Sequence, residues 1–478
     1  MSYTKLKTLL EKHNQEHLLQ FWDNISEKEQ ELLVNELTSL NIPEITSIFH
    51  RAKSSDDAKE QLIDNKIKPI PPNTIESIQQ SSLEKLDSYE NIGLQEIADG
   101  KVAVILLAGG QGTRLGVDFP KGMFNIKLPS ERTLFHLQAL RIKSLQNLAK
   151  RKLGKSKDIT WYIMTSDATH DSTVDYFETN DHFGLNKNNI IAFKQGTLPC
   201  FKFDGKIILD DKYRISKAPD GNGGLYTALK NEGIINDMKS RGINSVHAFS
   251  VDNILVKVAD PVFLGFCISR SADCGVKVVK KRSADEPVGV VCQVDEKYRV
   301  VEYSEILPST AELQNDKGEL VFNAGNICNH YFTVSFLDEI ANKYENSLDL
   351  HIAKKKIPFL NESGNKIKPD KPNGIKVEKF VFDVFKYSNN FAVWEVIREN
   401  EFSALKNSNE AGVDCPSTAR SDILNLHKRW LLNAGAKSVE GDVEVCPLVS
   451  YNGENLSDLV NNKSLQGPQC LMSSDYTY

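Results

Sequence analysis

Short apolar runs alternate with helical patterns between about residue 98 and residue 400. The run 102–107 is continuously apolar, rich in β-branched residues and closed by glycines, which predicts a buried parallel strand. Similar runs predict strands at 159–165, 190–193, 246–251 and 276–279. A helical pattern covers 134–150. The alternation predicts an α/β fold with a Rossmann-like, mostly parallel central sheet, which binds ligands at the carboxyl ends of its strands.

The two ends of the chain have different patterns. Leucine and aromatic residues recur at helical spacing over the first sixty residues, and Ser26 and Glu29 form a capping box. A proline-rich stretch, 66–73, is expected to be an extended linker. Shorter mixed elements follow residue 400. These patterns predict a helical N-terminal module (1–97), a central domain (98–400) and a small C-terminal domain (401–478).

The first predicted strand runs into a glycine-rich loop. Gly109, Gly110 and Gly112 lack a Cβ, so they permit positive φ and let backbone N–H groups approach a ligand closely. Arg114 adds a planar charged fork, and Lys121 adds a mobile point charge. A bare G-x-G is more often an ordinary strand-to-helix turn, but the added arginine and lysine favour a phosphate site.

Two better-known phosphate loops do not fit this segment. The spacing G-Q-G-T-R-L-G from Gly110 is one residue too long for the dinucleotide fingerprint G-x-G-x-x-G. In a P-loop the final glycine is followed directly by Lys and Ser or Thr, whereas Lys121 here follows a proline and precedes Gly122. The spacing therefore disfavours a dehydrogenase and a P-loop enzyme.

Three further motifs place polar side chains at glycine-rich turns or strand ends, where they could bind a small ligand. Gly221 and Asn222 lie in a second glycine cluster, which is equally typical of a plain turn. Gln195 follows a strand and offers the paired donor and acceptor that a uracil edge needs, although a loop glutamine is usually only solvated. Asp252 ends an apolar run, where it suits either a magnesium ion or a helix N-cap.

Composition restricts the class of protein. The 478 residues contain 58 basic and 64 acidic side chains, a net charge of -6, which argues against a general nucleic-acid or membrane partner. The eight cysteines show no C-x-x-C pair or zinc spacing and are expected to be free thiols in a reducing compartment. The first residues lack the apolar region of a signal peptide. We therefore expect a cytoplasmic protein.

The segment Leu106 to Lys121, which reads L-x-A-G-G-x-G-T-R-L-G-x-x-x-P-K, resembles the signature of sugar-nucleotide pyrophosphorylases. The chain is most similar to the eukaryotic UDP-N-acetylhexosamine pyrophosphorylases, over about residues 95 to 456. This resemblance implies a nucleotidyltransferase-type fold. It also implies the reaction of UTP with N-acetylglucosamine 1-phosphate to give UDP-N-acetylglucosamine and pyrophosphate, with Mg²⁺ as cofactor.

The resemblance assigns roles to individual residues. The catalytic phosphate-handling residues would be Arg114, Lys121, Lys376 and Lys406. The UTP-binding residues would be Leu107, Ala108, Gly109, Gly110, Gln195, Gly221 and Asp252, of which Asp252 would hold the metal. The sugar-binding residues would be Asn222, Gly289, Glu302, Tyr303 and Asn326.

Departures from the family pattern leave the sugar less certain than the reaction. Asp167 stands where glycine is usual, and Ala404, which stands where proline is usual, is expected to loosen the segment that presents Lys406. N-acetylgalactosamine 1-phosphate or glucose 1-phosphate are alternative substrates. A UDP-sugar sensor without turnover is a second class of hypothesis, and a glycosyltransferase a third. We expect small-molecule partners and a monomer or weak homodimer.

Overall fold

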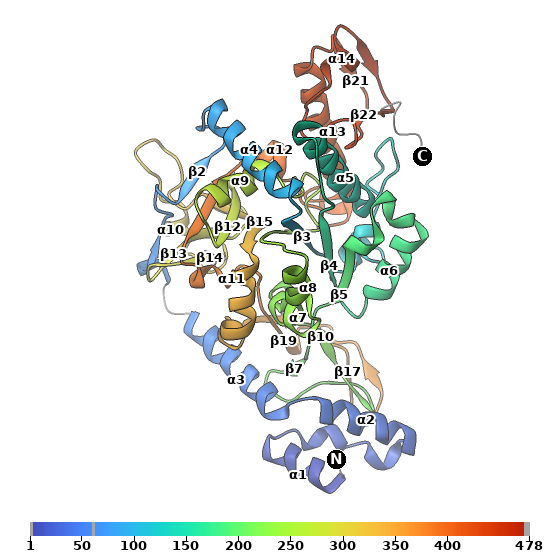
Figure 1. The fold of residues 1–478 in the computed structure, drawn as a ribbon. Coiled ribbons are helices and arrows are strands. Elements are labelled where there is room, and N and C mark those ends of the chain that lie inside the picture. Colours follow the sequence, from blue (N-terminus) through green and yellow to red (C-terminus); the bar gives the residue numbers. More distant parts are fainter. Residues whose placement is uncertain (1–2, 60–62, 473–478) are drawn as a thin grey trace. The chain divides into compact units, whose positions relative to one another are not determined.

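The structure is a computed structural model that describes residues 3–59 and 63–472 (Figure 1). The chain forms two compact units, each built from separate parts of the sequence. Unit 1 contains Met1–Asn65, Gln195–Thr227 and Tyr344–Asp383. Unit 2 contains Lys66–Lys194, Ala228–Lys343 and Val384–Tyr478. The expected division into three consecutive domains stays a prediction.

A large mixed sheet forms the centre of unit 2. Its main strand order is β2-β20-β12-β15-β11-β3-β4-β5. These strands are β2 (Ile75–Ser77), β3 (Val102–Leu107), β4 (Thr160–Thr165), β5 (Ile190–Lys194), β11 (Ser245–Ser250), β12 (Cys274–Lys280), β15 (Ala324–Thr333) and β20 (Phe391–Glu395). Every residue of β3 and β4 is buried, as expected of parallel strands covered on both faces. The predicted strands and the α/β class are therefore confirmed.

One strand interrupts the parallel arrangement. β15 runs antiparallel to both β11 and β12, whereas the other neighbouring pairs along the main order are parallel. β15 also pairs with a hairpin made of β13 (Val290–Val294) and β14 (Lys297–Val301). Residues 66–73, expected to be a linker, begin with β1 (Ile67–Lys68), which pairs antiparallel with β13.

Helices connect and cover these strands (Figure 1). They include α4 (Leu83–Ala98), α5 (Leu134–Leu153), α6 (His170–Thr179), α8 (Ile234–Ser240), α9 (Pro261–Ser269), α11 (Val334–Glu339) and α12 (Arg398–Glu401). The predicted helix at 134–150 is α5. Its N-cap is Thr133, whose side chain accepts from the His136 N–H, and it ends at Gly154 in the left-handed conformation (φ 72).

The C-terminal part of unit 2 has its own small core. It comprises α13 (Pro416–Asn433), β21 (Ser438–Glu440), β22 (Val443–Val445), α14 (Ser457–Val460), β23 (Ser464–Gln466) and β24 (Gln469–Leu471). The strands form two short parallel pairs, β21 with β23 and β22 with β24. Leu431, Val443 and Leu456 are among the buried residues of this core.

Unit 1 joins the N-terminal helices to small antiparallel sheets. The helices are α1 (Tyr3–Lys12), α2 (Glu27–Ser39) and α3 (Ile42–Lys59), and the largest of the sheets has the order β16 (His351–Lys355), β19 (Gly374–Glu378), β7 (Phe201–Lys202). α2 begins with the predicted capping box of Ser26 and Glu29. Leucines of the helices share a core with Phe201 and Val377. The N-terminal helices thus pack on later segments of the chain.

Two general expectations can be compared with the structure. All eight cysteines are free thiols, as predicted. Within the described ranges, the chain contains no helix both long and apolar enough to span a bilayer.

Two glycines allow α4 and α9 to pack at close range in unit 2. A Cβ at Gly93 would lie 2.0 Å from the Pro261 carbonyl oxygen, and one at Gly265 would lie 1.8 Å from that of Tyr89. Both distances are far below van der Waals contact. The two helices therefore touch through their backbones, and any larger residue would force them apart.

We expect Gly265→Ala to destabilise unit 2 by about 1 to 3 kcal/mol, because the added methyl group overpacks a rigid backbone contact. Helix propensity alone would favour alanine over glycine by about 1 kcal/mol. The matched control is Asn91→Ala at an exposed position of α4. Thermal unfolding of both variants measures the difference. A Gly265→Ala protein as stable as the control would contradict the close packing.

Candidate active site

The glycine-rich loop follows β3 and is closed by hydrogen bonds of its own backbone. The Gly112 N–H donates to the Phe119 carbonyl (3.1 Å), and the Lys121 N–H donates to the Gly110 carbonyl (3.3 Å). From the end of β4, the Ser166 hydroxyl donates to the Gly109 carbonyl (2.8 Å). The loop is therefore held in one conformation at the carboxyl edge of the sheet, the location that the sequence predicts.

The left-handed residue of this loop is not one of those expected. Gly116 has a φ of 82°, whereas Gly109, Gly110 and Gly112 do not have positive φ. Gly112 is needed for a different reason, since a Cβ there would lie 2.3 Å from a methyl group of Val117. Gly110 is exposed and has nothing within 4 Å of an added Cβ. The approach to the Gly110 backbone is thus open.

Arg114 lies in a short 3-10 helix, η4 (Thr113–Leu115), that forms part of the loop. Its side chain is exposed, and no ion pair to it is seen in the described part of the chain. A guanidinium that is not committed to a carboxylate retains its donors for an incoming phosphate.

Lys121 and Asp252 form an ion pair at this edge of the sheet. Their atoms Nζ and Oδ1 are 2.6 Å apart, and Lys121 also donates to the Leu405 carbonyl (3.2 Å). The pair follows from the register, because Leu107 lies beside Ser250 at the ends of the parallel strands β3 and β11. Asp252 does not cap a helix, since the N-cap of α9 is Asp260.

The segment that carries Lys406 is joined by its backbone to the segment that carries Asp252. The Leu405 N–H donates to the Asp252 carbonyl (2.8 Å), and the Ile254 N–H donates to the Ser403 carbonyl (3.0 Å). Ala404, expected to loosen this segment, is instead buried between these bonds. The structure therefore corrects that expectation: the bonds fix the segment without a proline.

Cys328 is a neighbour of this site that the sequence did not indicate. Burial raises the pKa of its thiol to about 12, with Asp252 raising it and Lys406 lowering it. The thiol is therefore protonated at neutral pH and does not act as a nucleophile. The charges of Asp252 and Lys406 both act on this thiol, so Cys328 lies near the two segments that carry them.

A buried network of charges lies behind the Asp252 segment. Lys277, which is completely buried on β12, donates to the carboxylates of Asp260 and Glu401. Lys257 pairs with the other oxygen of Glu401 (3.2 Å). Two ammonium groups thus balance two carboxylates. Burial acts to raise the pKa of Asp260, but Lys277 and Lys257 outweigh it and hold that pKa below its ordinary value.

Asn253 connects this network to the site. Its amide nitrogen donates to the Glu401 carbonyl (2.7 Å), and its oxygen accepts from the N–H groups of Ser403 (3.0 Å) and Leu255 (3.1 Å). Asn253 is the residue after Asp252 and bonds to the segment that leads to Lys406. The buried charges therefore fix the backbone on both sides of the candidate catalytic groups.

Three of the residues assigned to the sugar lie together near the β13–β14 hairpin. The Asn326 N–H donates to the Gly289 carbonyl (2.8 Å), and a Cβ at Gly289 would lie 3.0 Å from a carboxylate oxygen of Glu302. The Asn326 side-chain oxygen accepts from the Cys328 N–H (3.1 Å). Tyr303, next to Glu302, is half exposed (49%).

Ala108 is buried just after β3 in unit 2, and the other four predicted residues belong to unit 1. Gln195 is buried, and Lys376 is partly exposed on β19. Gly221 has a φ of 86°, and a Cβ there would lie 2.3 Å from the Lys379 carbonyl oxygen, so only glycine fits. The side-chain oxygen of Asn222 accepts from the Val381 N–H (2.9 Å). Asn222 therefore retains its amide donors and one lone pair of its oxygen for a ligand.

Asp220 is a buried residue in contact with two glycine-containing segments of unit 1. Its carboxylate packs against Gly196 and Gly224, where an added Cβ would lie 2.8 Å and 2.0 Å from its oxygens. Its Oδ1 has no hydrogen-bond partner among the described residues. Burial raises the pKa of Asp220 to about 7, against a lowering effect of Lys379.

The departure at Asp167 has a compensating partner. Its Oδ1 lies 3.3 Å from the Nζ of Lys194, and both side chains are largely exposed. The added negative charge is therefore balanced at the surface, with a small energetic effect.

Comparison with known proteins shows the family to which this chain belongs. Residues 43–462 match the family model described as UTP–glucose-1-phosphate uridylyltransferase. The chain is a member of that family. It is 48% identical to the UDP-N-acetylhexosamine pyrophosphorylase-like protein 1 of Xenopus tropicalis, over 97% of this chain and 96% of that protein.

Two further relatives support the membership. The chain is 43% identical to the UDP-N-acetylglucosamine pyrophosphorylase of Saccharomyces cerevisiae, over 95% of this chain and 96% of that protein. The uridine diphosphate N-acetylglucosamine pyrophosphorylase of Trypanosoma brucei, solved in complex with an inhibitor, is 28% identical and has a TM-score of 0.84, with all of both chains covered. The resemblance drawn from the glycine-rich motif is thus confirmed.

For this uridylyltransferase-family protein, we expect Lys277→Met to lower the free energy of unfolding by about 3 to 5 kcal/mol, because it leaves buried carboxylates short of one positive charge. The deficit should shrink as the pH falls from 8 to 5.5. Without Lys277, burial raises the pKa of Asp260 above its unfolded value, so protonation stabilises the variant at lower pH. Thermal unfolding at both pH values measures this.

The control for Lys277→Met is Lys280→Met on the same strand. Lys280 is exposed and forms a surface pair with Glu319 (2.9 Å), which is worth at most about 1 kcal/mol. The control should change little at either pH. Equal and pH-independent losses in the two variants would contradict the role of the buried network.

A second pH dependence is expected at Asp220, whose folded pKa of about 7 exceeds the ordinary value. The native carboxyl then stays protonated up to about pH 7, so its contribution to stability is fully present below the ordinary carboxyl pKa and is lost as the pH rises from there to 7. Asp220→Asn should therefore gain stability relative to the wild type as the pH rises from 5 to 7. The difference in melting temperature between the two proteins measures the effect, and a difference that does not change with pH would refute it.

Proposed function

We propose that this protein catalyses the reaction of UTP with N-acetylglucosamine 1-phosphate to give UDP-N-acetylglucosamine and pyrophosphate. The observation that carries the proposal is the placement of Lys121. Its ammonium group contacts both Asp252 and the backbone just before Lys406, so a phosphate-loop lysine, a carboxylate and a second lysine share one site. Relatives named as pyrophosphorylases of the same nucleotide sugar support the assignment.

The chemistry requires no covalent intermediate in this proposal. The sugar phosphate already carries a nucleophilic oxygen, which attacks the α-phosphorus of UTP as pyrophosphate leaves. Catalysis then consists of positioning and neutralisation of charge. We assign Lys121 and Arg114 to the α-phosphoryl group and the departing pyrophosphate, Lys376 to the nucleotide phosphates and Lys406 to the sugar phosphate.

The available ligands suit Mg²⁺ better than a metal ion that is coordinated by several protein side chains. No cluster of three or more metal-ligating side chains is found within residues 3–59 and 63–472. Mg²⁺ typically leans on one or two carboxylates and on substrate phosphates. Asp252 would hold the ion, with part of its side chain exposed (29%). When bound, Mg²⁺ would supply positive charge to the triphosphate.

The other assigned residues supply recognition. We assign the uracil to Gln195 and Gly221, and the loop backbone of residues 107–110 to the nucleotide. Asn222 and the group of Gly289, Glu302, Tyr303 and Asn326 are assigned to the sugar. A Cβ at Gly289 would lie 2.7 Å from a methyl group of Val300 and 3.0 Å from a carboxylate oxygen of Glu302, so only glycine fits beside these two side chains. N-acetylgalactosamine 1-phosphate is a second proposed substrate.

Release of pyrophosphate tests the proposed reaction. The enzyme is incubated with UTP, Mg²⁺ and, in parallel, the 1-phosphates of N-acetylglucosamine, N-acetylgalactosamine and glucose. We expect the fastest release with N-acetylglucosamine 1-phosphate. If none of the three releases pyrophosphate, the proposal fails. Calorimetric binding of UDP-N-acetylglucosamine in that case would identify a sensor.

We expect Lys121→Ala to lower kcat by at least about a hundredfold, because it removes one preorganised contact to the transition state. Lys127→Ala is the matched control. Lys127 is an exposed lysine of the neighbouring segment and pairs at the surface with Glu131 (3.3 Å). The control should retain wild-type turnover. A Lys121→Ala enzyme with a kcat within threefold of the wild type would remove Lys121 from the mechanism.

A further inference from the structure

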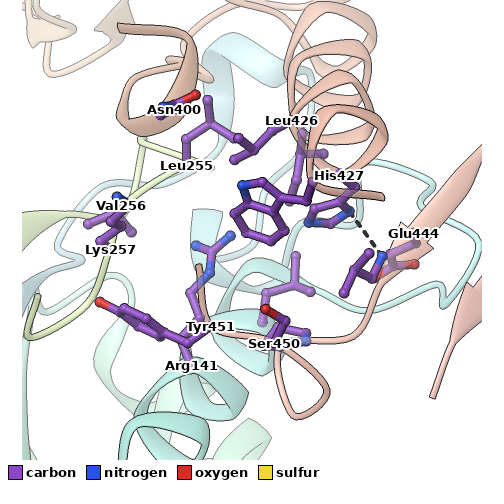
Figure 2. Close-up of a pocket in the computed structure, with 15 residues that line it drawn as sticks. Arg141, Leu255, Val256, Lys257, Asn400, Leu426, His427, Glu444, Ser450 and Tyr451 are labelled. Carbon is purple, nitrogen blue, oxygen red and sulfur yellow. Dashed lines mark hydrogen bonds between the residues drawn. The ribbon is translucent and has the colours of Figure 1, made fainter. Parts of the chain in front are cut away.

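The residues that line a small cavity within unit 2 (Figure 2) are not among those assigned to the substrates. The cavity has a volume of about 20 Å³. Its walls come from α5, from residues 255–257 just after the Asp252 segment, from α13, and from residues 444–451. This volume accommodates about one particle the size of a water molecule.

The guanidinium of Arg141 extends from α5 into this cavity (Figure 2). One of its N–H groups donates to the Ile254 carbonyl (2.8 Å). Within the described ranges, no carboxylate lies within 4.0 Å of the guanidinium, and no other hydrogen bond to it is found. Burial lowers the pKa of Arg141 to about 10, so the group stays charged at neutral pH.

The charged groups nearest the cavity already have partners. Lys257 pairs with Glu401 (3.2 Å). Glu444 is completely buried, and its oxygens accept from the N–H and the hydroxyl of Ser130 (both 2.8 Å). Among the described residues, neither carboxylate forms an ion pair with Arg141. Arg141 is only partly exposed, and a cation that faces a cavity of this size without a counter-ion is disfavoured, since one water molecule would hydrate it without neutralising its charge.

His427 adds a second donor to the wall. Its Nδ1 accepts from the Val445 N–H (3.1 Å), so the ring hydrogen lies on Nε2 when the ring is neutral. Burial, together with the charge of Arg141, lowers the pKa of His427 to about 3, which keeps the ring neutral. The cavity is thus lined by a guanidinium that forms no ion pair among the described residues, by a neutral histidine, and by apolar residues such as Leu137, Leu255 and Ile423.

We propose that this cavity binds one small monovalent anion of the size of chloride, held by Arg141 and His427. The anion supplies the missing counter-charge between α5 and α13. Because Arg141 also holds the Ile254 carbonyl, the bound anion ties the C-terminal elements to the segment that follows Asp252. The site is independent of the proposed reaction and does not require that the enzyme act on any particular sugar.

Diffraction from crystals of the wild-type protein soaked in bromide locates such an anion directly. Bromide replaces chloride and gives anomalous signal. We expect an anomalous peak within hydrogen-bonding distance of the Arg141 guanidinium. A cavity without anomalous signal, filled only by water, would overturn the proposal. This measurement needs no variant, so it decides the question even if a substituted protein fails to fold.

Thermal unfolding tests the same site in solution. With potassium chloride in place of potassium gluconate at equal ionic strength, the melting temperature of the wild type should rise by about 1 to 2 °C if the anion is at about ten times its Kd. Arg141→Met should lose this increment. Arg151→Met, the same change at an exposed position of α5, should retain it. Equal increments in wild type and Arg141→Met would overturn the proposal.

Discussion

The buried pairing of Lys277 with Asp260 and Glu401 is the constraint on which the site depends. A lysine that is completely buried on a central strand must have its charge compensated, and here the two carboxylates come from the N-cap of α9 and from α12. Distant parts of the chain are thereby joined to one sheet. Hydrophobic residues could fill the same space, but they would not determine which segments of the chain pair with each other. The specific pairing sets the position of Glu401, and through Asn253 it sets the backbone beside Asp252.

Parallel strand register provides the second part of the arrangement. β3 and β11 are neighbours, so their carboxyl ends present the glycine-rich loop and Asp252 at the same edge. Lys121 lies 14 positions beyond the end of β3, yet the backbone bonds within the loop return it to that edge. The loop shape and the strand register therefore bring the ammonium group to the carboxylate. Neither feature would suffice alone, since a correctly paired sheet with an open loop would leave Lys121 in solvent.

Local sequence patterns were sufficient to predict the structural features that depend on residues close together in the sequence. The fully apolar β3, the helix α5 and the capping box of Ser26 appear in the structure where their patterns indicated. Features set by distant residues were missed. Nothing near Lys277 indicates Glu401, which is 124 residues away, and the use of the Asn222 oxygen by Val381 depends on a contact over 159 residues. The antiparallel β15 was also missed, because an apolar run carries no sign of its direction. The motifs were sufficient to identify the candidate site residues. They were not sufficient to predict which residues form hydrogen bonds or ion pairs with them.

The pair of Lys121 and Asp252 has a consequence for the order of binding under the proposed function. Without ligand, the ammonium group is the counter-ion of the carboxylate, at 2.6 Å. A divalent cation on Asp252 would face that ammonium group at close range, so binding of free metal is opposed by the repulsion of like charges. A metal that arrived with a triphosphate would bring an anion with which Lys121 could pair instead. One ion pair would then be exchanged for two, which would favour the metal–nucleotide complex over the metal alone. Under the proposed function, occupation by the metal would therefore depend on the presence of the nucleotide.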